Sequence, residues 1–230
     1  MYSIVYRFFK NYFKYRYKKP VIFGVENYDS SISAIFMCNH EKFYGPIITT
    51  TRFPIPKRIW ANSMTVEKEA TRKYVTESFF MGEKKKGEKT SRFYGYLLGT
   101  LVSHVISNSN PIIAYWDNQR ARKSIRSGIE VIVKGENQLM FARRREFTKG
   151  KITFMPGYLF LCKIAAKKHG ITPKIYPIAV NKEKSTIAIG KPTSLDINLD
   201  YEEESNRINK YLSDLVMLGH EDPKKMAAMK

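Results

Sequence analysis

A histidine in the segment Cys38-Asn39-His40-Glu41 is the side chain of this sequence that is best placed for chemistry. It follows an apolar run, residues 33–38, that is typical of a buried strand, and a helical segment begins at Pro46. In α/β folds, reacting groups gather at such strand-to-helix turns. We therefore predict that His40 is exposed at a turn, where an imidazole can do acid–base chemistry.

A histidine of this kind needs a group that orients it, and the position five residues on, where an acidic partner would be most useful, is Gly45. Glu41 is adjacent and would normally point away, whereas Tyr44 can offer one hydrogen bond but cannot offset a positive imidazole. Asp117, at the end of another predicted strand, could approach from across the sheet. The alternative is that His40 only caps a helix or binds the backbone.

A second candidate is a basic loop between a predicted strand and a predicted helix. Its cations are Arg143, Arg144, Arg145, Lys149 and Lys151. Guanidinium groups bind phosphate through two parallel hydrogen bonds, so this loop suits a phosphate or phosphodiester headgroup. A solvated basic loop without a specific ligand is the alternative.

The elements that must position these residues alternate along the chain. Strands are expected at 21–25, 34–38, 58–61, 111–116, 138–141, 174–180 and 186–189, and helices at 46–51, 66–80, 91–107, 118–134, 157–168 and 201–218. This alternation predicts a single α/β domain with a mostly parallel sheet covered by helices. Residues 82–90 are expected to form a solvated loop, and Glu221–Lys230 a frayed tail.

The N-terminus has the pattern of a basic amphipathic helix. One side of the helical wheel carries Met1, Ile4, Val5, Phe8, Phe9 and Tyr12, and the other carries Arg7, Lys10, Lys14 and Lys18. Such a helix can lie in the headgroup region of an anionic membrane, or its apolar side can pack on the protein's own core. The expected organisation is a membrane-interface helix at 1–19, an α/β domain at 20–219 and a flexible tail at 220–230.

Composition narrows the partners and the compartment. The 230 residues include 40 Lys and Arg against 21 Asp and Glu, a formal charge of +19, which favours a polyanionic partner. No nucleic-acid-recognition motif is present, so an anionic membrane is the expected partner and nucleic acid is not. Cys38 and Cys162 form neither a disulfide framework nor a metal-ligand spacing, and no metal site is expected. Without a spanning run or a signal peptide, we expect a cytoplasmic protein, peripheral on the inner face of the cell membrane.

Further segments follow the His40 turn in a fixed order. They are a strand ending at Phe141, the pair Gly150-Lys151, a helix opening at Gly157, and a strand with Pro173 and Pro177. This order resembles the 1-acylglycerol-3-phosphate acyltransferase (PlsC-like) superfamily of glycerolipid acyltransferases over roughly residues 20–190. The family pattern is an Asn-His turn, a strand ending Phe-Pro-Glu-Gly-Thr-Arg, a Gly-Lys pair, a Phe-x-x-Gly helix start and a Pro-Ile-x-Pro-Val strand.

The chain departs from the family pattern at its functional residues. The family's aspartate falls on Gly45, and its Pro-Glu-Gly falls on Ala142-Arg143-Arg144. The family also has a second motif with an arginine, and this arginine has no clear counterpart near Tyr115-Trp116-Asp117. In a serine protease triad, loss of the orienting carboxylate costs about 10⁴ in kcat, so the Gly45 substitution bears directly on activity.

The resemblance implies an O-acyltransferase in which His40 is the general base on the acceptor hydroxyl. The donor would be acyl-CoA or acyl carrier protein, as a co-substrate, and the acceptor a lysophospholipid-like molecule. Asn39, Glu41, Tyr44 and Gly45 would shape the substrate side of the turn, and the Arg143–Lys151 loop would hold phosphate. The alternative is a catalytically degenerate relative that keeps the fold as a lipid-binding or membrane-docked module.

Overall fold

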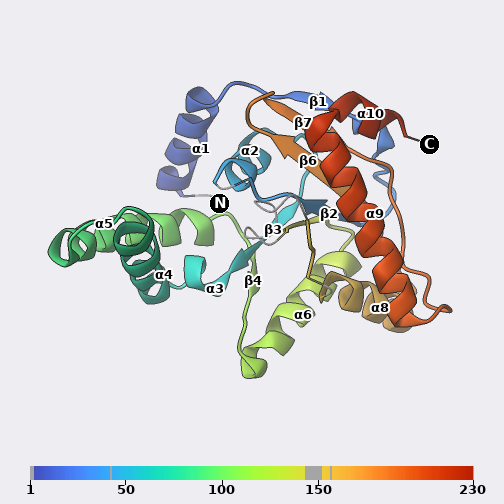
Figure 1. Cartoon of the computed structure of the whole chain (residues 1–230). Helices are drawn as coiled ribbons and strands as arrows, with labels where there is room; N and C mark the ends of the chain where they lie inside the picture. Colours follow the sequence, from blue (N-terminus) through green and yellow to red (C-terminus); the bar gives the residue numbers. More distant parts are fainter. Residues whose placement is uncertain (1–2, 42, 143–151, 156, 230) are drawn as a thin grey trace. The chain divides into compact units, whose positions relative to one another are not determined.

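The computed structural model describes residues 3–41, 43–142, 152–155 and 157–229. The chain divides into two compact units, which we describe separately (Figure 1). Unit 1 comprises residues 1–11 and 58–127, and unit 2 comprises residues 12–57 and 128–230. Two helices have residues in both units: α1 (Ile4–Arg16) and α6 (Asn118–Val133).

Unit 2 contains the sheet that carries the His40 turn. Its strands are β1 (Val21–Phe23), β2 (Ala34–Cys38), β5 (Gln138–Phe141), β6 (Lys174–Asn181) and β7 (Thr186–Ile189), in the order β1-β7-β6-β2-β5. All neighbours pair in parallel except β6 and β7. Every residue of β2 is buried, because its continuous apolar run suits a strand covered on both faces.

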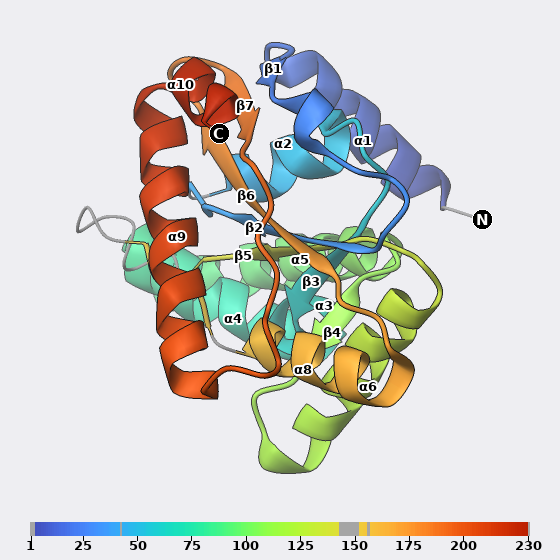
Figure 2. The ribbon, with the colours of Figure 1, turned by 90° about the vertical axis from the view of Figure 1, so that its right-hand side faces the viewer.

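Helices cover this sheet. They are α2 (Tyr44–Arg52), α8 (Gly157–His169), α9 (Tyr201–Glu221) and α10 (Pro223–Ala228), with a 3₁₀ turn, η1 (Val25–Asn27). Figure 2 shows α9 alongside β6. Its buried residues Ile208, Leu212 and Val216 recur every four positions, the spacing of one helix face. Asp200 caps the first turn by accepting hydrogen bonds from two backbone N–H groups.

Besides the first parts of α1 and α6, unit 1 contains a small parallel sheet and a helical hairpin. The two strands are β3 (Arg58–Asn62) and β4 (Ile112–Ala114). The helices are α3 (Ser63–Val66), α4 (Lys68–Tyr74), the π-helical η2 (Val75–Glu83) and α5 (Glu88–Ser107). Both α4 and η2 pack along α5. None of the helices described in the structure is long and apolar enough to cross a bilayer.

The α/β class and the mostly parallel strand pairing are confirmed, and a strand lies at each predicted place. The helix predicted at 66–80 is divided into α3, α4 and η2, and α5 begins inside the segment predicted as a loop at 82–90. The prediction of a frayed tail is wrong at residues 223–228. These form α10, because Asp222 caps its first turn and Met226 is fully buried against Gly219.

Candidate functional site

His40 lies where β2 ends, as the sequence predicts for a strand-to-helix turn. In the sheet, β2 has β6 on one side and β5 on the other, so this turn is at the carboxyl ends of parallel strands. The imidazole is partly exposed and packs against the ring of Phe141, the last residue of β5, with 5.3 Å between ring centroids. A partly exposed imidazole on a rigid strand end is suited to proton transfer.

Asn39 fixes the start of the turn. Its buried side chain accepts a hydrogen bond from the Val180 backbone N–H at 2.7 Å and donates one to the Val180 carbonyl at 2.8 Å. The amide therefore pairs with β6 as a further strand residue would. Removing it would leave two backbone polar groups unpaired inside the protein, which costs roughly 1–3 kcal/mol for each group. Asn39 thus has a positioning role, because both polar ends of its side chain bond to Val180 and neither is directed to a substrate.

Glu41 directs its carboxylate to the turn between β6 and β7. The backbone N–H of Lys182 donates to both carboxylate oxygens at 2.9 Å. The imidazole Nε2 of His220, in the last turn of α9, lies 3.8 Å from the same carboxylate. Glu41 itself has a φ of 35°, in the left-handed region that ordinary residues seldom adopt. The carboxylate contacts hold this strained residue in place, which sets the direction of the chain beside His40.

Tyr44 and Gly45 form the first turn of α2. Tyr44 is buried and packs edge-to-face on Tyr17, with 5.5 Å between centroids, and burial raises the pKa of its phenol. A Cβ on Gly45 would lie 2.4 Å from the His40 carbonyl oxygen and 2.9 Å from that of Asn39. Real Cβ atoms do not approach so closely, so the turn as folded accepts only glycine here. The position at which the family has its aspartate therefore carries no carboxylate, and no side chain fits there in the turn as folded.

Asp117 belongs to unit 1, and its carboxylate is engaged there. One oxygen accepts the backbone N–H of Arg120 and the other accepts its guanidinium, both at 2.8 Å. The hydrogen bond from the Arg120 backbone is the main cause of a lowered pKa of Asp117. Asp117 therefore caps the start of α6, and its proposed role as a partner of His40 stays a prediction.

The remaining motif positions are divided between described and undescribed segments. Phe141 ends β5, Gly157 opens α8, and Pro177 lies in β6 opposite Met37 of β2. The predicted phosphate-binding residues, Arg143, Arg144, Arg145, Lys149 and Lys151, lie outside the described residues. The sequence did not indicate His220 or the Lys182 backbone as neighbours of the turn. A contact of Glu41 with a backbone group 141 positions away has no signal in side-chain type or spacing.

The two cysteines are unsuited to nucleophilic chemistry. Both are buried, and burial raises the pKa of the Cys38 thiol and raises that of Cys162 to about 12. A thiol that keeps its proton is a poor nucleophile. Although Cys38 adjoins the turn, the imidazole of His40 is therefore the candidate for acid–base chemistry.

Comparison with known proteins gives one clear similarity. No protein-family model and no curated protein sequence matches this chain. Among solved structures, it is similar to the 1-acyl-sn-glycerophosphate (LPA) acyltransferase PlsC from Thermotoga maritima, with a TM-score of 0.54 and 18% sequence identity. The similarity covers 98% of this chain and 79% of that protein. It shows that the two proteins share a fold.

Proposed function

We propose that this protein is a membrane-associated O-acyltransferase with His40 as its general base. The observation that carries this proposal is the place of His40, at the carboxyl end of β2 in a fold similar to that of PlsC. The order of motifs from Asn39 to Pro177 supports it independently of the structure. The proposed donor is an acyl thioester, acyl-CoA or acyl carrier protein, and the proposed acceptor is a hydroxyl of a lysophospholipid-like molecule.

The reaction needs only one proton acceptor from the protein. His40 would take the proton of the acceptor hydroxyl as its oxygen forms a bond to the thioester carbonyl carbon. The carbon–sulfur bond then breaks, and the thiol leaves with a proton returned from the imidazole. A positioned base is worth about 10² to 10⁴ in rate. The role of Asn39 and Glu41 is to hold the turn, through Val180 and Lys182, so that the imidazole is in place before substrate binds.

The acceptor's phosphate is assigned to the basic segment of residues 143–151. Three arginines in succession, with two lysines nearby, supply the planar donor groups that phosphate prefers. Arg143 stands where the family has the glutamate of its Pro-Glu-Gly sequence. This change replaces a negative charge with a positive one, so the proposed acceptors include headgroups with more negative charge than a simple phosphomonoester.

The deciding experiment measures transfer from labelled acyl-CoA, and in parallel from acyl carrier protein, to a panel of lysophospholipids. We expect His40→Ala to lose about 10² to 10⁴ of the wild-type rate. His169→Ala is the matched control, because His169 is an exposed histidine at the end of α8, and it should retain full activity. Equal turnover by the wild type and His40→Ala would overturn the assignment of His40.

A lipid-binding module without catalysis is the second candidate, and the closed position at Gly45 favours it. No carboxylate can replace that glycine in the turn as folded, so an imidazolium formed during the reaction lacks the stabilisation that the family gives it. Binding of lysophospholipid without turnover under any donor would support this candidate.

A further inference from the structure

The helical hairpin of unit 1 has an unusual interior. Within residues 63–107, all of which the structure describes, the only large apolar side chain that is buried is Val75. The other buried positions are small or polar: Ser63, Thr71, Ser91, Gly95, Gly99 and Ser103. Four of these recur at every fourth position of α5, which places them on one face. That face packs against α3, α4 and η2.

The helices of this hairpin approach at backbone contact. A Cβ on Gly95 would lie 1.9 Å from Oγ1 of Thr76, and one on Gly99 would lie 2.6 Å from Cα of Arg72. The Ser103 hydroxyl donates to the Val66 carbonyl at 2.6 Å. Small residues and such hydrogen bonds replace the usual core of large side chains. Helices surrounded by lipid associate through small residues and hydrogen bonds of this kind, because no hydrophobic effect drives them together there.

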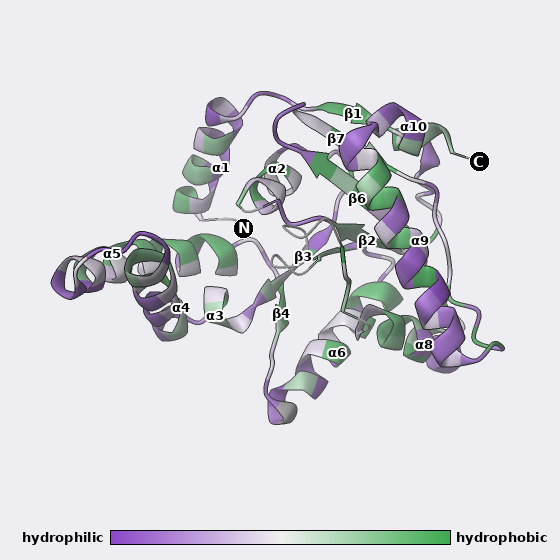
Figure 3. Ribbon diagram, viewed as in Figure 1, coloured by the Kyte–Doolittle hydropathy of each residue, from purple (hydrophilic) through white to green (hydrophobic). Residues whose placement is uncertain are grey.

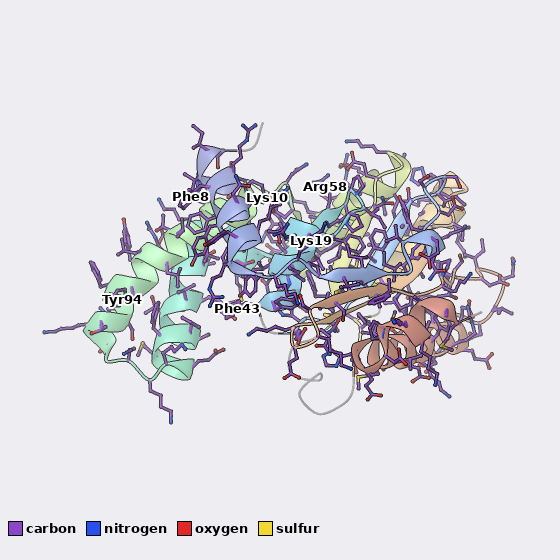
Figure 4. The ribbon with its side chains drawn as sticks, turned by 90° about the horizontal axis from the view of Figure 1, so that it is seen from above. Phe8, Lys10, Lys19, Phe43, Arg58 and Tyr94 are labelled. Atoms are coloured by element: carbon purple, nitrogen blue, oxygen red, sulfur yellow. The ribbon has the colours of Figure 1, made fainter. Side chains whose placement is uncertain are left out.

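The opposite face of α5 carries the large apolar residues that the interior lacks. Phe93 and Leu97, one turn apart, are 62% and 50% exposed. The start of α1 lies beside α5, where Val5 lines a shallow apolar groove with Leu97 and Leu101, and it leaves Ile4 85% and Phe8 65% exposed. Figure 3 shows hydrophobic residues on both helices, and Figure 4 shows Phe8 and Tyr94. We call Ile4, Phe8, Phe93, Tyr94, Tyr96 and Leu97 the apolar face.

Cations border the apolar face at the tip of the hairpin. Lys84, Lys85, Lys86 and Lys89 are all exposed there. The ammonium of Lys84 lies 5.6 Å from the ring centre of Phe79. The neighbouring ring of Phe80 packs on Tyr94, with 5.8 Å between centroids. Aromatic rings with lysines at their edge suit the headgroup region of a membrane, where rings lie at the polar–apolar boundary and cations meet lipid phosphates.

We infer that the apolar face of unit 1 docks on an anionic lipid surface, with α5 lying in the headgroup region. Exposed large apolar side chains over a core of small ones are the reverse of the arrangement that water favours. Basic residues at the border match the negative charge of such a surface. This contact deepens the membrane association in the proposed function, but it requires no acyl transfer, so vesicle binding and the His40 assay can fail separately.

Vesicle binding of paired variants tests the inference. Phe93→Ser/Leu97→Ser should bind vesicles of phosphatidylcholine and phosphatidylglycerol at least about tenfold more weakly than the wild type, because two apolar side chains that would enter the lipid are lost. Phe160→Ser/Leu199→Ser is the matched control, since Phe160 on α8 and Leu199 before α9 are 45% and 57% exposed in unit 2. It should bind as the wild type does. Equal binding by all three proteins, or an equal loss in both variants, would overturn the inference.

The basic border has its own test. Lys84→Gln/Lys85→Gln/Lys86→Gln should weaken binding to anionic vesicles by roughly fivefold for each lysine that contacts the surface, and should leave binding to pure phosphatidylcholine unchanged. Self-association of the wild type in vesicle-free solution, abolished by Phe93→Ser/Leu97→Ser, would assign the face to a second copy of the chain and would overturn the lipid assignment.

A positional measurement makes the test independent of affinity. The native thiols of Cys38 and Cys162 are 0% and 1% exposed, so a spin label introduced by Leu97→Cys can be attached selectively. With anionic vesicles, the label at position 97 should be protected from an aqueous nickel relaxant, and a label at position 199 should not. A label at position 97 that stays accessible to the relaxant would show that α5 does not contact lipid.

Discussion

At the scale of the residue, Gly45 explains both the geometry of the His40 turn and its missing carboxylate. The chain doubles back so tightly that the His40 carbonyl occupies the space of any side chain at position 45. Glu41 meanwhile adopts its left-handed φ of 35° and binds the Lys182 backbone. The sequence predicts the turn and the absence of the aspartate. It could not predict that the absence is a steric requirement, because that depends on backbone atoms that no residue type specifies.

We expect Gly45→Ala to destabilise the protein by about 2 kcal/mol or more, because the new methyl group must displace backbone. In an open helical position the same change stabilises by about 1 kcal/mol. Gly87→Ala is the control, since nothing lies within 4 Å of a Cβ there, and it should change stability by less than about 1 kcal/mol. Urea unfolding followed by circular dichroism measures both. Gly45→Ala with wild-type stability would show that the turn can open, and Gly45→Asp should then be assayed for a gain in acyl transfer.

At the scale of the element, the sequence predicts best the strands whose apolar runs are continuous. The observed bounds of β2, β5 and β7 match the predicted ranges. The runs of β2 and β7 end at Asn39 and Gly190, a polar residue and a turn residue. The sequence predicts an element poorly where packing between distant segments decides whether that element forms. The short helix α10 has good helix formers and the Asp222 cap, but a six-residue helix is too short to be stable by itself, and it forms around Met226, which packs on Gly219 and close to Gly190. The π-helix η2 likewise cannot be distinguished from an α-helix by periodicity.

Helix α9 owes part of its stability to an ion pair in its first turns between the buried Glu204 and the half-exposed Arg207. The carboxylate of Glu204 is almost fully buried, and it accepts hydrogen bonds from the guanidinium of Arg207 and from the Asp196 backbone. Arg207 lowers the pKa of Glu204. The ionised pair therefore stabilises the fold above the ordinary glutamate pKa of about 4.3, and this contribution is lost as the pH falls through the lowered value.

Glu204→Gln should accordingly reduce the free energy of unfolding at pH 7 by about 1–2 kcal/mol, a figure that allows for the half-exposed Arg207. The difference from the wild type should shrink as the pH is lowered below 4, because the wild-type carboxylate then takes up a proton. Glu203→Gln removes an exposed charge from the same turn and should differ little from the wild type at any pH. A deficit in Glu204→Gln that persists unchanged in acid would contradict the ionic origin of this stability.

At the scale of the whole molecule, the formal charge of +19 and the exposed apolar residues suit the same surface. The predicted N-terminal helix is confirmed as α1, and its Ile4, Phe8, Tyr12 and Tyr15 are all exposed. The sequence left open the alternative that the whole apolar side of this helix packs on the protein's own core. That alternative does not hold for these four residues, because they are exposed. Their contact with a membrane stays a prediction. Charge attracts the protein from a distance, and apolar side chains hold it once it is there.

These two contributions can be separated with Ile4→Ser/Phe8→Ser, which keeps the buried Tyr6 that a truncation would remove. We expect binding to anionic vesicles at low salt to fall by about tenfold or more, because two apolar side chains no longer enter the headgroup region. Val21→Ser/Val25→Ser, which changes two exposed apolar residues of unit 2, should bind as the wild type does.

Added salt distinguishes the two contributions in the same assay. It should weaken binding of the wild type without abolishing it, since screening removes the attraction between charges but leaves the apolar term. For Ile4→Ser/Phe8→Ser combined with Phe93→Ser/Leu97→Ser, the same salt should abolish binding, because charge is then the main remaining attraction. Binding of this quadruple variant that resists salt would place the membrane contact elsewhere on the protein.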